Sequence, residues 1–107
     1  MGKIGGEQMS TRSTQELLVI MRELKPKIMK RYKAKEIELF GSIVRGEPSE
    51  TSDIDILVDF EEGADLFDLT GLAIFLEEEL GRKVDVVPKR ALREELRQSV
   101  LREAMPL

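Results

Sequence analysis

Six residues between positions 41 and 85 have the types and spacing of a site that binds a phosphate and a metal ion. Two of them, Asp53 and Asp55, alternate along the apolar segment D-I-D-I-L-V. At roughly 6.5 to 7 Å two carboxylates repel by roughly 2.5 kcal/mol in an effective dielectric of ~20. Hydration of an exposed surface would offset this, but Mg²⁺ would do so better, because it prefers carboxylate oxygens. The six are Gly41, Ser42, Arg45, Asp53, Asp55 and Asp85.

Asp85 is the single acid of a second apolar segment, V-D-V-V. If this strand lies beside the strand of Asp53 and Asp55, its carboxylate joins theirs. Three carboxylates from two strands hold a pair of Mg²⁺ ions, roughly 3.5 to 4 Å apart, in enzymes that transfer phosphoryl or nucleotidyl groups. The alternative is that Asp85 is an edge-strand charge that prevents aggregation.

Gly41 and Ser42 follow a short apolar strand and supply the phosphate-binding part of the pattern. Glycine allows backbone N–H groups to approach an anion closely, and a hydroxyl beside it adds a donor. Arg45, three residues after Ser42, reaches the same anion with its guanidinium group. A structural turn at Gly41 and an ion pair between Arg45 and Glu47 are the alternatives.

The elements that position these residues follow the order αβ(α)βαβα. Apolar residues at helical spacing predict a first helix of about 18 residues, which Ser13 begins in a capping box. Asp65 and Gly81 predict the start and the end of a later helix. We expect an α+β fold with a small mixed sheet of about three strands, with helices packed on one face. The later elements are strands over 35–40, 53–60 and 83–87, one helical turn at S-I-V-R-G, and helices over 66–80 and about 90–104.

Alternation along the strand over 53–60 separates two faces. Ile54 and Ile56 point into the core, whereas Asp53 and Asp55 point to the other side, which we expect to be open. Asp59 shares the parity of these acids but lies toward the far end of the strand, so we expect it to be solvated. The run of acids over 77–79 is expected to be a solvated helix face.

The composition of the 107-residue chain narrows the chemistry further. We expect one domain over 13–107 after a flexible lead-in over 1–12. The absence of Cys and His excludes imidazole catalysis, thiol nucleophiles and Cys- or His-ligated zinc. The net charge is −4, and residues 51–107 carry 14 acidic against 7 basic side chains, so nucleic acid is not expected as a direct partner. No apolar run reaches the roughly 20 residues that span a membrane, so we expect a cytoplasmic protein.

The combination of G-S, ten residues, D-I-D and a later strand acid resembles the DNA polymerase beta-like nucleotidyltransferase superfamily. More narrowly, LFGSIVRGEPSETSDIDILVDF is similar to the minimal nucleotidyltransferase (MNT) family, and the resemblance runs from about Leu17 to the C-terminus. It implies two Mg²⁺ ions on Asp53 and Asp55, with Asp85 completing one ion site near the acceptor hydroxyl. It also implies that Gly41 and Ser42 hold the nucleotide triphosphate and that Arg45 assists at its phosphates.

The resemblance also implies a partner and a reaction. Members of the MNT family are often encoded beside a HEPN-domain ribonuclease toxin, and act as its antitoxin by transferring AMP from ATP to a tyrosine of the toxin. We therefore expect a protein adenylyltransferase with ATP as substrate. The alternatives are a non-catalytic antitoxin that neutralises a HEPN partner by forming a complex, and a nucleotide sensor. The base preference, the acceptor and a homo-oligomeric state remain open.

Overall fold

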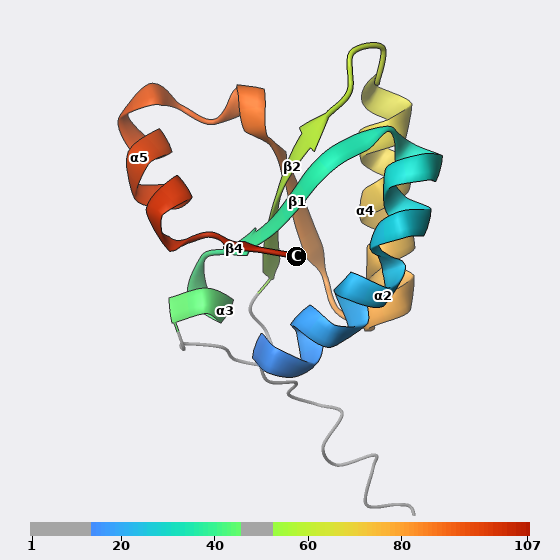
Figure 1. Ribbon diagram of the computed structural model, residues 1–107, viewed down its shortest axis with the longest axis horizontal. Helices are drawn as coiled ribbons and strands as arrows, with labels where there is room; N and C mark the ends of the chain where they lie inside the picture. Colours follow the sequence, from blue (N-terminus) through green and yellow to red (C-terminus); the bar gives the residue numbers. More distant parts are fainter. Residues whose placement is uncertain (1–13, 46–52) are drawn as a thin grey trace, which may run out of the picture.

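The fold is a mixed β-sheet with helices on both sides, seen in a computed structural model that describes residues 14–45 and 53–107 (Figure 1). The expected α+β class and element order are confirmed, and the described residues add a fourth strand at the C-terminus. The predicted cap at Ser13 lies outside the described residues. The elements are α2 (Thr14–Tyr32), β1 (Ala34–Phe40), α3 (Ser42–Arg45), β2 (Ile54–Phe60), α4 (Leu66–Leu80), β3 (Val84–Pro88), the 3₁₀ turn η1 (Lys89–Ala91), α5 (Glu94–Glu103) and β4 (Met105–Pro106).

The strand order is β3-β2-β1-β4. β1 runs antiparallel to both β2 and β4, whereas β2 and β3 are parallel. Parallel neighbours need a crossover connection, and α4 provides it between β2 and β3. The adjacency of β2 and β3, which was assumed from the sequence, is therefore confirmed.

The core lies on the face of the sheet that α2 and α4 cover (Figure 1). The predicted alternation along β2 holds, because Ile54, Ile56 and Val58 have no exposed surface. Their neighbours in the core come from every element of this layer. These include Leu17, Met21 and Ile28 of α2, Ile37 and Leu39 of β1, Leu72, Leu76 and Leu80 of α4, and Val84 and Val86 of β3.

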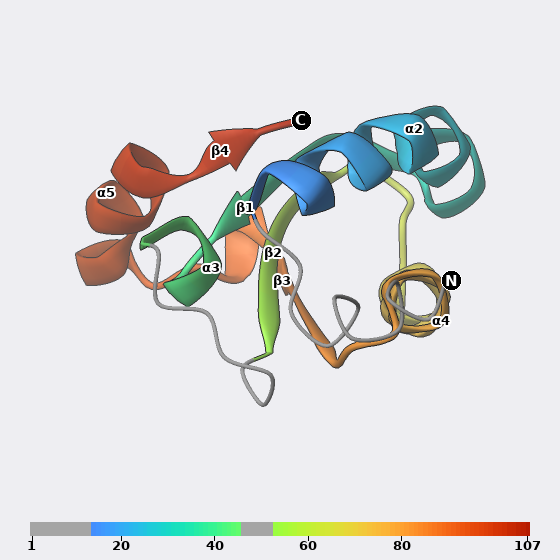
Figure 2. The same ribbon diagram turned by 90° about the horizontal axis from the view of Figure 1, so that it is seen from below.

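The opposite face is not open along its whole length, contrary to expectation. Leu57 shares the side of Asp55 by alternation, yet it is only 1% exposed and lies outside the core cluster. Figures 1 and 2 show α5 on the side of the sheet away from α2 and α4, and η1 contacts β2. The predicted helix over 90–104 is shortened to α5, because Leu92 and Arg93 are extended at ψ 129° and 144°.

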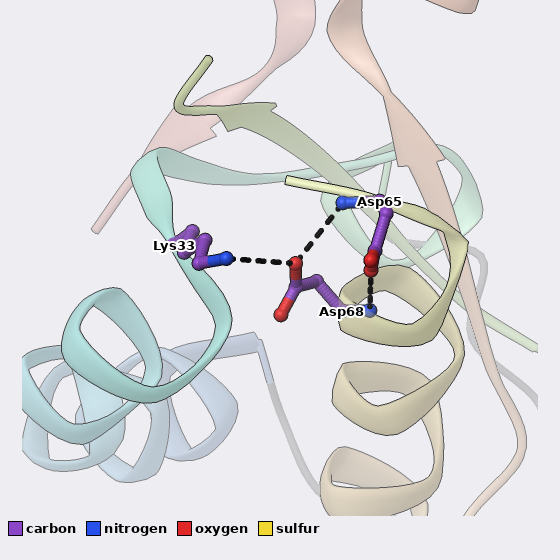
Figure 3. Close-up of polar contacts among 3 residues, drawn as sticks. All are labelled: Lys33, Asp65 and Asp68. Atoms are coloured by element: carbon purple, nitrogen blue, oxygen red, sulfur yellow. Dashed lines mark hydrogen bonds and ion pairs between the residues drawn. The ribbon is translucent and has the colours of Figure 1, made fainter. Parts of the chain in front are cut away.

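The bounds of α4 agree with those predicted from its caps. The Asp65 carboxylate accepts a hydrogen bond from the Asp68 amide at 3.1 Å, and the Asp68 carboxylate accepts one from the Asp65 amide at 3.0 Å (Figure 3). Lys33 lies 3.9 Å from the same Asp68 carboxylate and so connects the end of α2 to the start of α4. Gly81 ends the helix in the left-handed conformation, at φ 69°.

Among the three acids expected to be solvated at the end of α4, Glu77 differs from the other two. Glu78 and Glu79 are exposed. The Glu77 carboxylate instead accepts a hydrogen bond from the Val84 amide at 3.1 Å, which fixes the entry into β3. Within the part of the chain that the structure describes, no helix has the length and apolar character needed to cross a membrane.

Candidate active site

The acids predicted as metal ligands lie at the start of the two parallel strands. Asp55 of β2 and Asp85 of β3 are direct Cα partners, so they share a face of the sheet, on strands that lie roughly 4.8 Å apart. Asp53 immediately precedes β2, and alternation places it on the same side. Asp55 is half-buried, whereas Asp53 and Asp85 are exposed. The structure therefore brings the three acids to one end of the sheet.

Gly41 joins the predicted phosphate-binding turn to these acids. It follows β1, whose last residue, Phe40, is the Cα partner of Asp55. Its φ is +85°, and a Cβ placed on it would overlap the Asp55 carboxylate and lie 3.1 Å from its Cγ. Both the backbone conformation and the space thus require glycine. Gly41, in the predicted phosphate-binding turn, therefore lies against Asp55, one of the predicted metal ligands.

The turn after Gly41 forms α3, the short helix expected at S-I-V-R-G. The Val44 amide donates to the Gly41 carbonyl at 3.0 Å, and Ile43 is fully buried in the core. α3 is thereby held against β1 and β2. Ser42 and Arg45 form its two ends, but their side chains lie outside what the structure describes, so their phosphate-binding roles remain predictions.

The donor set suits Mg²⁺ in chemistry, because all three acids offer carboxylate oxygens. In residues 14–45 and 53–107, however, no three acidic side chains lie close enough together to hold a metal ion as they are oriented. Exposed side chains such as those of Asp53 and Asp85 change rotamer readily. The pairing of Asp55 with Asp85 leaves both carboxylates on one face of the sheet, and the role of the three acids as ligands remains a prediction.

Two further carboxylates near this site were not singled out from the sequence. Glu38 of β1 is the Cα partner of Leu57. Its Oε1 is buried and has no hydrogen-bond partner among the described residues. Alternation along β1 would have placed Glu38 on the face that carries Asp55. Glu103 of α5 accepts a hydrogen bond from the Gly41 amide at 3.0 Å, and no spacing in the sequence indicates a contact across 62 residues.

Comparison with known proteins places this geometry in a family. Residues 21–107 match the model of the nucleotidyltransferase domain. The chain is 41% identical over 97 residues to the protein adenylyltransferase MntA of Thermococcus cleftensis, an alignment that covers 91% of this chain and 98% of that protein. A solved structure of a protein assigned as a minimal nucleotidyltransferase superposes with a TM-score of 0.78 at 44% identity, covering 90% of this chain and 97% of that one.

Two similar structures are complexes. A toxin–antitoxin pair solved with AMP-PNP matches at a TM-score of 0.65 and 30% identity, over 78% of this chain and 69% of that one. A tri-AMPylated HEPN toxin of Shewanella oneidensis in complex with its MNT antitoxin matches at a TM-score of 0.60 and 26% identity. The match covers 83% of this chain and 69% of that one. The match to the domain family over most of the chain and the similarity to MntA along nearly its whole length agree with the motif and the fold. The chain belongs to the nucleotidyltransferase domain family, as a minimal nucleotidyltransferase of the MntA type, and is a nucleotidyltransferase enzyme.

Proposed function

We propose that the protein is a cytoplasmic, Mg²⁺-dependent adenylyltransferase that transfers AMP from ATP to a tyrosine hydroxyl of a HEPN ribonuclease toxin, and so acts as its antitoxin. The observation that carries the proposal is the position of Asp55, which is the strand partner of Asp85 and also contacts Gly41. The predicted metal ligands and the predicted phosphate-binding turn therefore lie side by side, which supports a single site. The names of the relatives support the reaction and the partner: one is a protein adenylyltransferase, and another is an MNT antitoxin in complex with an AMPylated HEPN toxin.

Each part of the site would have a separate task. Gly41 and Ser42 would hold the triphosphate, and Arg45 would bind its phosphate oxygens. Asp53, Asp55 and Asp85 would hold two Mg²⁺ ions, which supply charge stabilisation to the triphosphate and the leaving pyrophosphate when bound. The toxin–antitoxin complex solved with AMP-PNP supports ATP as the nucleotide.

The reaction balances without a further reactant. The tyrosine oxygen forms a bond to the α-phosphorus of ATP, and the bond from that phosphorus to the oxygen it shares with the β-phosphate breaks. Pyrophosphate leaves, and the hydroxyl proton passes to solvent. Asp53 and Asp85 are exposed, so a hydroxyl on the surface of a folded partner can reach this end of the sheet.

The alternative is a non-catalytic antitoxin that blocks a HEPN partner by binding alone. The similar solved structures support it, because in them an antitoxin is bound to its toxin. The two functions differ in their product, since only the enzyme leaves AMP on the toxin.

Mass spectrometry of the intact toxin separates them. The protein is incubated with ATP, Mg²⁺ and the proposed HEPN partner, and we expect the HEPN protein to gain the mass of AMP. Asp53→Ala should abolish the gain. Asp59→Ala is the matched control, because Asp59 lies on β2 with the same parity as Asp53 but near the far end of the strand, where it pairs with Lys35 at 3.9 Å. A stable complex without any adduct would exclude the transferase and favour the binder.

A further inference from the structure

The C-terminal helix contributes a carboxylate to the turn at Gly41. The Gly41 amide donates a hydrogen bond to Oε1 of Glu103, the last residue of α5, over 3.0 Å in a partly buried position. Backbone amides of a glycine turn are the donors that usually bind anions. In this structure, one of these donors is bound by a carboxylate from 62 residues away in the chain.

Strand pairing explains how Glu103 reaches this position. β4 pairs antiparallel with β1, with Met105 opposite Leu39. The Leu107 amide donates a hydrogen bond to the Ile37 carbonyl of β1 at 3.2 Å. Extended by two residues, the same register would place Glu103 opposite Gly41. The chain is already helical there, so a side-chain oxygen accepts the bond that a strand carbonyl would otherwise accept.

The end of the chain is fixed from a second side. The Lys25 ammonium group of α2 donates to the carbonyl of Leu107 at 3.1 Å, in a partly buried position. Together with the pairing of β4, this contact ties the segment that carries Glu103 to the core layer. The backbone on the C-terminal side of Glu103 is therefore held in place by contacts with β1 and α2.

Gly41 is constrained on two sides as a result. Its Cα lies against the Asp55 carboxylate, which leaves no room for a side chain, and its N–H is bound by Glu103. Its carbonyl accepts from Val44 and so begins α3. Hydrogen bonds to an ionised acceptor are shorter and stronger than those between neutral groups. The bond to Glu103 thus fixes the direction in which the turn and α3 leave β1.

We propose that Glu103 is a positioning residue that holds the Gly41 turn in the conformation that binds the nucleotide phosphates. The inference rests on the proposed function of this turn. It makes the α5–β4 segment a part of the nucleotide site, although no residue of the family motif lies in it.

The test compares Glu103→Ala, which removes the acceptor, with Glu103→Gln, whose amide oxygen can accept the same bond without the charge. Glu95→Ala is the matched control, because it removes an exposed acid from the first turn of the same helix. Two quantities are measured on the full chain: the hydrogen-exchange rate of the Gly41 amide by NMR, and the Kd for α,β-methylene-ATP with Mg²⁺. The α–β linkage of this analogue cannot be cleaved by adenylyl transfer. Thermal unfolding of each variant confirms that it is folded.

For Glu103→Ala we expect Gly41 exchange and the Kd each to rise about tenfold, the scale of one lost hydrogen bond. Glu103→Gln should bring both the Gly41 exchange rate and the Kd most of the way back to the wild-type values. Glu95→Ala should match the wild type in both quantities. If Glu103→Ala fails to fold, Glu103→Asp, which keeps the charge but is one methylene shorter, should show the same two changes.

Unchanged Gly41 exchange in Glu103→Ala would overturn the proposal. So would tighter nucleotide binding by both Glu103→Ala and Glu103→Gln, because Glu103 would then be an anion that competes with the phosphates. A wild-type protein that binds no nucleotide would refute the proposed function instead. Gly41 exchange alone would in that case decide whether Glu103 holds the turn.

Discussion

Replacing Gly41 by alanine should destabilise the protein more than the same change at another glycine with positive φ. At φ +85°, alanine costs about 1–2 kcal/mol from the backbone alone. The new Cβ would also overlap the Asp55 carboxylate, and forcing extra atoms into a packed position typically costs about 1–3 kcal/mol. We therefore expect a loss of about 2–5 kcal/mol in the free energy of unfolding.

Gly81 provides the matched control. Its φ is +69°, and a Cβ there would meet no heavy atom within 4 Å, so Gly81→Ala should cost only the backbone part, about 1–2 kcal/mol. In an Asp55→Ala background the overlap with the carboxylate disappears, and only the contact with the Asp55 Cβ, at 3.2 Å, remains. The cost of Gly41→Ala should then fall toward that of Gly81→Ala.

Thermal and urea unfolding measure these differences in Gly41→Ala, Gly81→Ala, Asp55→Ala and the Gly41→Ala/Asp55→Ala double variant. For a domain of this size, each kcal/mol lowers Tm by about 4–8 °C. The reasoning would be refuted if Gly41→Ala and Gly81→Ala cost the same in the wild-type background. It would also be refuted if Asp55→Ala left the cost of Gly41→Ala unchanged, because contact with Asp55 would then play no part.

Three further substitutions test the frame around the site. Asp68→Ala removes half of the α4 capping box and should cost about 1 kcal/mol in urea unfolding; no loss would contradict the capping role. Glu77→Ala removes the acceptor of the Val84 amide and should lower the free energy of unfolding by about 1–2 kcal/mol. Its control, Glu78→Ala at an exposed position, should change the free energy of unfolding by no more than about 0.5 kcal/mol, so equal melting temperatures would be inconsistent with the bond. Phe67→Ser, at a side chain 86% exposed, should also stay within about 0.5 kcal/mol; a larger loss would mean that Phe67 packs against the fold.

Local patterns were sufficient to predict most of the elements and the grouping of the acids. Asp65 and Gly81 determine both ends of α4 through capping and a left-handed residue, and both signals lie within a few positions of the helix. Alternation along β2 separated Ile54 from Asp55. The pairing of Asp55 with Asp85 required only that two consecutive strands, joined by one helix, lie side by side.

The remaining features depend on contacts between distant parts of the chain. β4 is two residues long, too short for any periodicity, and forms because it pairs with β1. The bond from Gly41 to Glu103 follows from that pairing. Nothing in the sequence around Leu57 indicates that η1 and α5 lie on its side of the sheet. The sequence therefore predicted the acids and the turn, but not the segment that supports the turn.

The position of the label in the product identifies the group that the protein transfers. The protein is incubated with Mg²⁺, the proposed HEPN partner, and ATP labelled either at the α- or at the γ-phosphorus, and the radioactivity retained by the denatured HEPN protein is counted. Adenylyl transfer predicts that the toxin retains the α label and not the γ label, and that Asp85→Asn reduces the amount retained. Retention of the γ label, or no label on a toxin that nevertheless binds the protein, would contradict the account.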